Sequence, residues 1–167
     1  MQLFSRLFSS LNGASVKYLV AGGIAVNLYG IQRSTADIDL VLKLDEENID
    51  KFLEVVQLLG LKAKVPVPLE QFRLEGQRAR WVREKGMRVF SFYDAHNPFF
   101  LLDVFVEEPF DFDRVYRSRR DFALDDIAIP VVPITELIAM KEISDRPQDR
   151  ADIYFLRKVL EEWTHEG

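Results

Sequence analysis

Three aspartates of this chain lie where they can do metal-assisted chemistry. Asp37 and Asp39 flank Ile38 at the start of an apolar run, and Asp103 interrupts a second apolar segment, residues 99–106. Because side chains alternate along a strand, Asp37 and Asp39 share one face, with their backbones about 6.5–7 Å apart. Two such carboxylates can hold divalent ions jointly. The alternative for this pair alone is an exposed strand end with two solvated acids.

Asp103 has the most restrictive surroundings of the three acids. Apolar residues occupy both faces of its expected strand, which predicts a central strand and an Asp103 that points into covered space. A buried carboxylate without a partner costs several kcal/mol, unless it is protonated or meets a cation. A divalent ion shared with Asp37 and Asp39 supplies that cation, and an arginine partner is the structural alternative.

Gly22 and Gly23 stand where an expected strand turns into an expected helix. Small residues at such a turn let a phosphate approach the backbone, and the first free N–H groups of the helix carry partial positive charge. A tight turn is the ordinary explanation of a glycine pair. Its position ahead of Asp37 and Asp39 is what indicates phosphate binding.

The elements that position these residues follow from hydrophobic periodicity, capping residues and prolines. Helices are expected at residues 1–13, 22–29, 45–60, 133–143 and 147–163, with a further helical stretch after Pro66 and Pro68. Strands are expected at residues 17–21, 37–43, 61–65, 87–93, 99–107 and 127–132. The strands at 87–93 and 99–107 are expected to form a hairpin, and the acidic residues from Glu107 to Asp126, which alternate with arginines, are interpreted as solvated.

This alternation of elements predicts one α/β (α+β) domain over residues 1–167, with a mixed β-sheet flanked by helices. The motif core is expected at residues 17–107 and the C-terminal helices at 133–163. The first 13 residues contain no acid, and they are interpreted as a helix in preference to a transit peptide.

The composition excludes several classes of protein. Zero cysteines exclude disulfides, thiolate zinc sites and cysteine nucleophiles, and two histidines make a histidine-rich metal site unexpected. The net charge of -5 argues against broad nucleic-acid binding, although a local basic patch stays open. No apolar run approaches the roughly 20 residues that a membrane helix needs. We therefore expect a cytoplasmic protein with no membrane partner.

The glycine pair and the three aspartates fall into one pattern. It runs from Ala21-Gly22-Gly23 through thirteen further residues to Asp37-Ile38-Asp39-Leu40, and later to Leu102-Asp103-Val104. This pattern resembles the signature of the polymerase-beta-type nucleotidyltransferase superfamily, which implies the nucleotidyltransferase fold. Many members of that superfamily have serine at the position of Gly23, so one hydroxyl contact with phosphate is lost here while the backbone contacts are kept.

Three segments also resemble a small bacterial group of that superfamily, which includes the AbiEii-type toxin nucleotidyltransferases. They are Arg33-Ser-Thr35-Ala-Asp37-Ile-Asp39, Thr135-Glu-Leu-Ile-Ala-Met-Lys141 and Arg146-Pro-Gln-Asp149-Arg-Ala-Asp152, with Gln148 where lysine is common. The resemblance covers residues 17–160. It implies an NTP substrate, two Mg²⁺ ions at the catalytic acids, and a cognate toxin or antitoxin protein as a partner.

The resemblance also distributes roles among these residues. The catalytic and metal-binding residues are Asp37, Asp39 and Asp103. The nucleotide- and phosphate-binding residues are Gly22, Gly23, Arg33, Thr35 and Lys141. The residues that support them from behind are Arg146, Asp149 and Asp152.

The residues themselves leave the later positions more open. Lys141 extends an apolar stripe of its helix, so it either reaches solvent from the helix end or enters a cleft to hold a phosphate. Asp149 and Asp152 adjoin the apolar stripe of the last helix and are expected to pair with Lys141, Arg146 or Arg33. Whether Arg33 serves the nucleotide or the acceptor stays undecided.

A basic stretch surrounds Trp81. Its members are Arg73, Arg78, Arg80, Arg83, Lys85 and Arg88. A solvated helix face is the plain interpretation of these residues. The alternative is a surface for RNA or another anionic acceptor, with Trp81 free to stack on a base.

Taken together, these residues predict a metal-dependent nucleotidyltransferase that moves a nucleoside monophosphate from an NTP to a hydroxyl group. The acceptor is unknown and is RNA, a protein or a small molecule, and a toxin–antitoxin or phage-defence system is the expected setting. The alternative is a catalytically silent nucleotide- or partner-binding module on the same fold.

Overall fold

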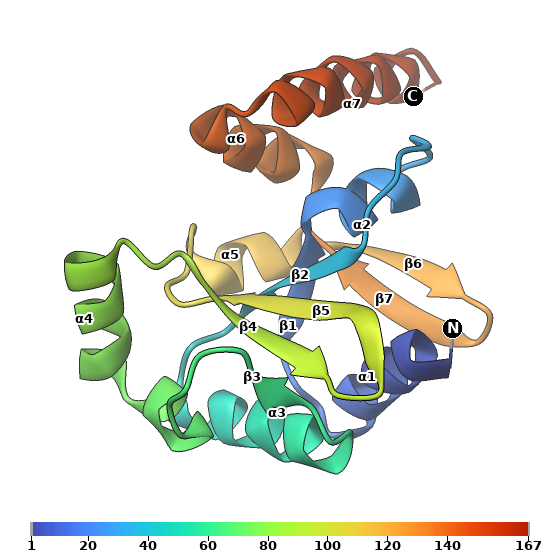
Figure 1. Ribbon diagram of the computed structural model, residues 1–167. Helices are drawn as coiled ribbons and strands as arrows, with labels where there is room; N and C mark the ends of the chain where they lie inside the picture. Colours follow the sequence, from blue (N-terminus) through green and yellow to red (C-terminus); the bar gives the residue numbers. More distant parts are fainter. Residues whose placement is uncertain (1, 167) are drawn as a thin grey trace.

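The computed structural model describes residues 2–166, and within them the strands form one mixed seven-stranded sheet (Figure 1). The strand order is β3-β4-β5-β2-β1-β7-β6. The strands are β1 (Tyr18–Ala21), β2 (Asp37–Leu42), β3 (Lys62–Ala63), β4 (Val89–Asp94), β5 (Asn97–Phe105), β6 (Arg120–Leu124) and β7 (Ile127–Val131). The expected mixed sheet and the hairpin of β4 with β5 are confirmed.

Strand β2 lies in the middle of this sheet, parallel to β5 and antiparallel to β1. Its burial alternates at first: Ile38 and Leu40 are buried, whereas Asp37 and Asp39 are half-buried on the opposite face. This is the period of two that a pleated strand imposes. Both acids therefore project from one face of the sheet.

The helices lie on both sides of the sheet (Figure 1). They are α1 (Gln2–Gly13), α2 (Gly22–Leu28), α3 (Glu46–Leu58), the short 3₁₀ helix η1 (Leu69–Arg73), α4 (Glu75–Lys85), α5 (Phe112–Arg117), α6 (Ile134–Ser144) and α7 (Pro147–Glu166). Helices α1 and α3 lie together beneath the sheet in Figure 1, while α6 and α7 pack on each other at the opposite end, beyond α2. The first helix is confirmed from Gln2 onward, and Met1 lies outside the described residues.

Helix α3 shows how local sequence fixes the lower layer. The Asp45 side chain accepts a hydrogen bond from the Asn48 backbone N–H at 2.8 Å, which satisfies a free donor of the first turn. The buried Asn48 amide in turn bonds the backbone of Lys17 and Lys43. These bonds tie the start of α3 to the ends of β1 and β2, and so hold the strand that carries the acids.

Aromatic rings fill the space between α3, η1, α4 and the outer strands. Phe52, Phe72, Phe90 and Phe92 are buried, with neighbouring ring centroids 5.2–6.4 Å apart. Trp81 of α4 is also buried and stacks on Phe90 at 5.2 Å. Well-packed aromatic pairs of this kind contribute about 0.5–1.5 kcal/mol each beyond their buried area. The outer strand β4 is therefore anchored to α3, η1 and α4 by buried aromatic contacts.

The elements differ from the expected ones in two places. The acidic residues of 107–126 are exposed, as expected, but the segment also contains α5 and β6, which were not predicted: Asp111 caps α5, and its Phe112 and Val115 are buried. The expected strand 61–65 is only the two-residue β3, which holds an edge beside β4. Among the described helices, none is long and apolar enough to cross a membrane.

Candidate active site

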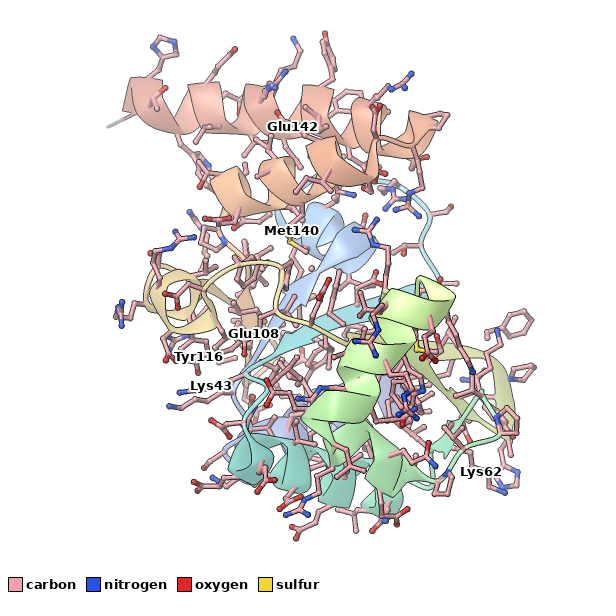
Figure 2. The ribbon with its side chains drawn as sticks, turned by 90° about the vertical axis from the view of Figure 1, so that its left-hand side faces the viewer. Lys43, Lys62, Glu108, Tyr116, Met140 and Glu142 are labelled. Atoms are coloured by element: carbon pink, nitrogen blue, oxygen red, sulfur yellow. The ribbon has the colours of Figure 1, made fainter. Side chains whose placement is uncertain are left out.

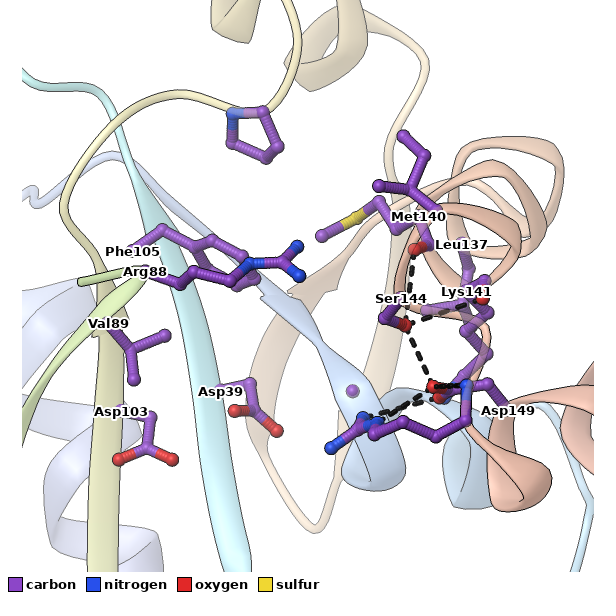
Figure 3. A pocket seen from close by; sticks show the side chains of 14 residues that line it. Asp39, Arg88, Val89, Asp103, Phe105, Leu137, Met140, Lys141, Ser144 and Asp149 are labelled. Carbon is purple, nitrogen blue, oxygen red and sulfur yellow. Dashed lines mark hydrogen bonds and ion pairs between the residues drawn. The ribbon is translucent and has the colours of Figure 1, made fainter. Parts of the chain in front are cut away.

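The sheet brings Asp39 and Asp103 side by side. In the parallel pairing of β2 with β5, the Cα partner of Asp39 is Asp103, and the partner of Asp37 is Leu101. Neighbouring strands lie about 4.8 Å apart, so the two carboxylates project from the same level of the sheet. Figure 3 shows both side chains on the floor of the same pocket.

A glycine turn lies directly against Asp39. Gly22 has a φ of +65°, a conformation that L-residues with side chains rarely adopt, and it begins α2. A Cβ atom added to Gly22 would lie 2.7 Å from Cγ of Asp39, so the absence of a side chain is what lets the carboxylate approach the turn. The free backbone N–H groups of this turn and the acid therefore meet at one place.

Gly23 is enclosed from the other side by the loop that leads into β2. An added Cβ would lie 2.8 Å from Cβ of Thr35, and it would also collide with the Arg33 guanidinium. The hydroxyl of Thr35 donates to the Asp37 carbonyl oxygen at 3.5 Å. A serine at position 23, as many superfamily members have, would have to displace these two side chains.

Burial and like charge perturb the sheet acids. Burial, followed by the charges of Asp103 and Asp37, raises the pKa of Asp39 to about 7, against the weaker opposing effect of Lys141 and Arg146. Burial also raises the pKa of Asp103, although a hydrogen bond from the Ser91 hydroxyl at 2.5 Å opposes it. No lysine or arginine among residues 2–166 forms an ion pair with Asp37, Asp39 or Asp103. The arginine partner considered for Asp103 is therefore not found.

A cavity of about 430 Å³ opens between the sheet acids and α6 (Figure 3). Its polar lining residues are Gly22, Asp39, Arg88, Asp103, Lys141, Ser144, Arg146 and Asp149, and its apolar ones are Val89, Phe105, Pro109, Leu137, Met140 and Ile143. Figure 2 shows Met140 on the side of α6 that faces the sheet, whereas Glu142 faces α7, where it accepts a hydrogen bond from Arg157. The cavity thus has an acidic floor, a basic end and an apolar wall.

Lys141 supplies part of the basic end. It is only 5% exposed, so it does not reach bulk solvent, and its Nζ lies 3.3 Å from Oδ1 of Asp149 and 2.8 Å from Oδ2 of Asp152. Both aspartates are buried. Burial alone raises the pKa of Asp149, but hydrogen bonds from Arg146 and Ser144 and the charge of Lys141 outweigh it and hold that pKa well below its usual range. The expected pairing of these acids with Lys141 is confirmed.

Two arginines complete this network. Nε of Arg146 donates to Asp149 at 2.8 Å from the junction between α6 and α7, and the Arg146 side chain lines the cavity. Nε of Arg33 lies 3.4 Å from Oδ1 of Asp152, so Arg33 joins the loop before β2 to α7. The later motifs are therefore physically connected to the glycine turn through Asp152 and Arg33.

The comparisons with known proteins agree with this arrangement. The family described as Nucleotidyl transferase AbiEii toxin, Type IV TA system, matches residues 6–161. The chain belongs to this AbiEii nucleotidyltransferase family. The resemblance read from the motifs is thereby confirmed, although no curated protein sequence matches the chain.

Solved structures place this AbiEii-family member on the nucleotidyltransferase fold. The lincosamide antibiotic adenylyltransferase LnuA, bound to lincomycin, has a TM-score of 0.62 and 17% identity, over 95% of this chain and 97% of that one. ANT(2")-Ia in complex with adenylyl-2"-tobramycin has a TM-score of 0.56 and 14% identity, over 93% and 85%. A nucleotidyltransferase from Thermotoga maritima, TM1012, gives 0.56 and 15%, over 99% and 92%. At these identities the likeness establishes the fold.

The structure does not gather every predicted site residue in the cavity of this AbiEii-family protein. Asp37 lies two residues from Asp39 on β2 but is not among the residues that line the cavity, and Gly23, Arg33, Thr35 and Asp152 do not line it either. Arg146 and Asp149, which were expected to act only from behind, line it directly. A helical motif places side chains on one face, but the sequence does not say how far each one reaches.

Sequence reasoning treated Arg88 only as part of the basic stretch and did not find Ser91 at all. Arg88 lines the cavity, and Ser91 holds Asp103. The alternation of Phe90, Ser91 and Phe92 was the available signal, because it places a polar side chain opposite Asp103 once the hairpin register is known. The register itself depends on the β4–β5 turn.

The alternative in which Trp81 stacks on a base is wrong. Its ring is 3% exposed and lies against Phe90. Arg78 is buried as well and donates to the Phe72 carbonyl oxygen at 2.6 Å, and Arg73 pairs with Asp50. Two of the six basic residues of this stretch are therefore engaged within the fold, whereas Arg80, Arg83, Lys85 and Arg88 are exposed.

The donor set of the sheet acids fits Mg²⁺. Residues 2–166 contain no group of three His, Cys, Asp or Glu side chains already gathered as a metal centre. Asp39 and Asp103 nevertheless offer only oxygen atoms, which magnesium prefers, and they lie at one level of the sheet. A divalent ion relieves the repulsion that raises the pKa of Asp39.

Proposed function

We propose that this protein is a Mg²⁺-dependent nucleotidyltransferase that transfers a nucleoside monophosphate from an NTP to a hydroxyl group. The observation that carries the proposal is the register pairing of Asp39 with Asp103 against the turn at Gly22. Lys141 lines the same cavity. Acid, glycine turn and cation are the three features that activating a triphosphate requires.

The triphosphate is expected to lie between the glycine turn and α6. The backbone N–H groups at Gly22 and Gly23 face phosphate oxygens, and Thr35 and Arg33 hold the turn in shape by packing over Gly23. Lys141 has three N–H donors, of which Asp149 and Asp152 engage two. The third is free for a phosphate oxygen.

The acids are expected to hold the metal and move the proton. Two Mg²⁺ ions held by Asp37, Asp39 and Asp103 would supply Lewis-acid activation and charge neutralisation at the phosphates. Asp103 is expected to accept the proton of the acceptor hydroxyl as general base. The acceptor oxygen then bonds to the α-phosphorus as the bond to the pyrophosphate oxygen breaks. Lys141 and Arg146 balance the charge of the departing pyrophosphate.

The acceptor is open between RNA, a protein and a small molecule. Membership of the AbiEii family supports a toxin–antitoxin setting in the cytoplasm, with a cognate toxin or antitoxin as partner. The match of this chain to almost the full length of LnuA supports a small hydroxylated acceptor. A catalytically silent binding module is the alternative, but it gives no chemical reason to keep three acids that repel one another.

The test is nucleotidyl transfer itself. The protein is incubated with Mg²⁺, each α-³²P-labelled NTP in turn and cell extract, with lincomycin and tobramycin as separate acceptor arms. Label on an acceptor with the wild type, absent from the Asp37→Ala/Asp39→Ala variant and after metal chelation, is the expected result. No transfer with any of the four nucleotides would contradict the proposal and favour the silent module.

A further inference from the structure

Arg88 is the cavity residue to which neither the fold nor the proposed mechanism gives a task. Its side chain lines the cavity from the residue before β4, and in Figure 3 its guanidinium points across the cavity toward Met140 of α6. Among residues 2–166 no acid forms an ion pair with it, whereas Lys141 and Arg146 in the same cavity are both paired. Arg88 is exposed and its guanidinium has no carboxylate partner, so it is available to a ligand.

The position of Arg88 assigns it to the acceptor half of the cavity. Gly22, Lys141 and Arg146 occupy the triphosphate end, on α2 and at the α6–α7 junction. Asp103 lies on β5, next to β4, where Val89 pairs with Phe105 and Ser91 pairs with Asp103. A hydroxyl that gives its proton to Asp103 therefore enters beside Arg88.

The rest of that half is apolar and has no second free acid. Val89, Phe105 and Pro109 line it. Lys64, which follows β3, donates its backbone N–H to Ser91 of β4 at 2.9 Å, so it lies on the β4 side of Asp103, as Arg88 does. Among the described residues neither Lys64 nor Arg88 forms an ion pair with an acid.

We infer that the acceptor is a small molecule that carries a carboxylate or phosphate ester beside an apolar body, and that Arg88 binds this anionic group. The inference rests on the proposed function and names its acceptor class. Arginine suits the task because its planar guanidinium donates two parallel hydrogen bonds to such a group. Polycations such as tobramycin, the adenylyl acceptor in the ANT(2")-Ia complex, would meet Arg88 with like charge.

A small acid fits better than a nucleic acid. Trp81 is buried, so the basic stretch has no aromatic ring to stack on a base, and Arg73 and Arg78 are engaged within the fold. The acceptor half offers one lining cation, which matches one anionic group. An extended phosphate backbone needs a series of them.

The first test separates acceptor binding from nucleotide binding. The cell extract is fractionated on an anion-exchange resin, and the fractions that accept the label are identified with the wild-type protein. The retained acceptor is then used to measure the kinetics of the Arg88→Gln, Arg88→Lys and Arg83→Gln variants. We expect Arg88→Gln to raise the KM for the acceptor roughly tenfold or more, because it loses a charge-assisted contact, with the KM for NTP unchanged. Arg88→Lys keeps the charge and retains most of the acceptor affinity. Arg83→Gln changes an exposed arginine of α4 outside the cavity and behaves as the wild type.

Three results would overturn the inference. They are an acceptor that flows through the anion-exchange resin, an Arg88→Gln variant with unchanged acceptor KM, and label on RNA with a steep salt dependence that Arg83→Gln also weakens. A structural role for Arg88 would instead raise the KM for NTP and would not be rescued by lysine.

The second test does not depend on activity. Inorganic phosphate is titrated by calorimetry into wild type and Arg88→Gln, both saturated with Mg²⁺ and a non-hydrolysable NTP analogue. Binding to the wild type that weakens roughly tenfold in the variant supports the anion site. Equal binding, or none to the wild type, overturns it even where transfer to another kind of acceptor is found. If no transfer occurs at all, the proposed function fails on its own test. The phosphate titration still shows whether Arg88 forms an anion-binding site.

Discussion

The molecule contains two groups of aspartates whose environments are opposite. Asp39 and Asp103 project from the sheet with no ion-paired cation among the described residues, and burial with mutual repulsion raises the pKa of Asp39 to about 7. Asp149 and Asp152 at the α6–α7 junction are more deeply buried, yet Lys141 and two arginines contact them. The pKa of Asp149 is consequently held well below its usual range.

The difference distinguishes acids that oppose folding when they are ionised from acids that support it. A group whose pKa is raised on folding lowers the free energy of unfolding at pH values above its unfolded pKa. Ionised Asp39 therefore opposes folding. A group whose pKa is lowered on folding contributes stability above its unfolded pKa, so ionised Asp149 supports it. The ionised sheet acids oppose folding, a cost that a bound metal ion would remove, whereas the helix acids hold Lys141 in two ion pairs.

The largest expected effect follows from Asp39→Asn. Transfer should fall by roughly 10²–10³-fold or more, because a charged ligand of the site is lost. The same change should raise the free energy of unfolding of the metal-free protein by about 1–2 kcal/mol at pH 8, since it removes the charge repulsion. Urea unfolding from pH 3 to pH 9 measures this difference together with a transfer assay.

The pH dependence gives this prediction its sign. Wild-type Asp39 is neutral in both states below its unfolded pKa near 3.8, so the two proteins should be equally stable there. Their stabilities should separate as pH rises toward the folded pKa of about 7. Asp126→Asn, in an exposed turn, is the matched control and should change neither property. An Asp39→Asn variant that is less stable at pH 8 would refute the assignment of strain to the sheet acids.

The next largest effect concerns the ion-paired aspartates at the α6–α7 junction. Asp152→Asn leaves Lys141 buried with one acid and Arg33 without its partner, so we expect a loss of about 3–5 kcal/mol in the free energy of unfolding. Thermal and urea unfolding measure this loss. Asp145→Asn is the control, because Asp145 and its partner Arg150 are exposed and such a pair contributes about 0–1 kcal/mol. Equal losses of stability in Asp152→Asn and Asp145→Asn would show that the buried ion pairs contribute no more than the exposed one.

A smaller effect links the sheet acids to the glycine turn. Gly22→Ala should destabilise the protein by about 2 kcal/mol, partly from its φ of +65° and partly from collision with Asp39. Gly86 has a φ of +59° but open space around it, so Gly86→Ala isolates the backbone contribution of about 1 kcal/mol. The double variant Gly22→Ala/Asp39→Ala should recover the part of the Gly22→Ala loss that comes from the collision with Asp39. Additive losses in this double-mutant cycle would mean that Asp39 does not abut the turn.

How much of this could be seen in the sequence differs between the two groups. Asp37, Asp39 and Asp103 were found because strand alternation and an acid in an apolar run are local signals. The exact pairing of Asp39 with Asp103 was not, because β2 and β5 are separated by more than 50 residues and their register is set by packing. Lys141 and Asp149 were found on a helical stripe, but their mutual burial depends on how α6 and α7 dock.

The fold shows the same limit. Strongly periodic elements such as α3 and the β4–β5 hairpin were predicted nearly to their ends. Helix α5 was missed because its six residues hold only two buried side chains between exposed arginines. The task of Arg88 was invisible for a related reason, since its charge is unremarkable until the cavity places it opposite α6.

The smallest expected stability effect lies where the two groups approach each other. Arg146 pairs with Asp149 but also lines the cavity and is 73% exposed at its side chain. Arg146→Gln should lower the free energy of unfolding by less than about 1 kcal/mol, because exposed ion pairs contribute little. It should nevertheless raise the KM for NTP several-fold, since the guanidinium is expected to balance phosphate charge. Arg150→Gln, in the first turn of α7 and outside the cavity, should leave the KM for NTP unchanged. If Arg146→Gln costs stability and leaves the KM for NTP alone, Arg146 belongs with the helix acids only, and the triphosphate end of the cavity relies on Lys141 and the glycine turn.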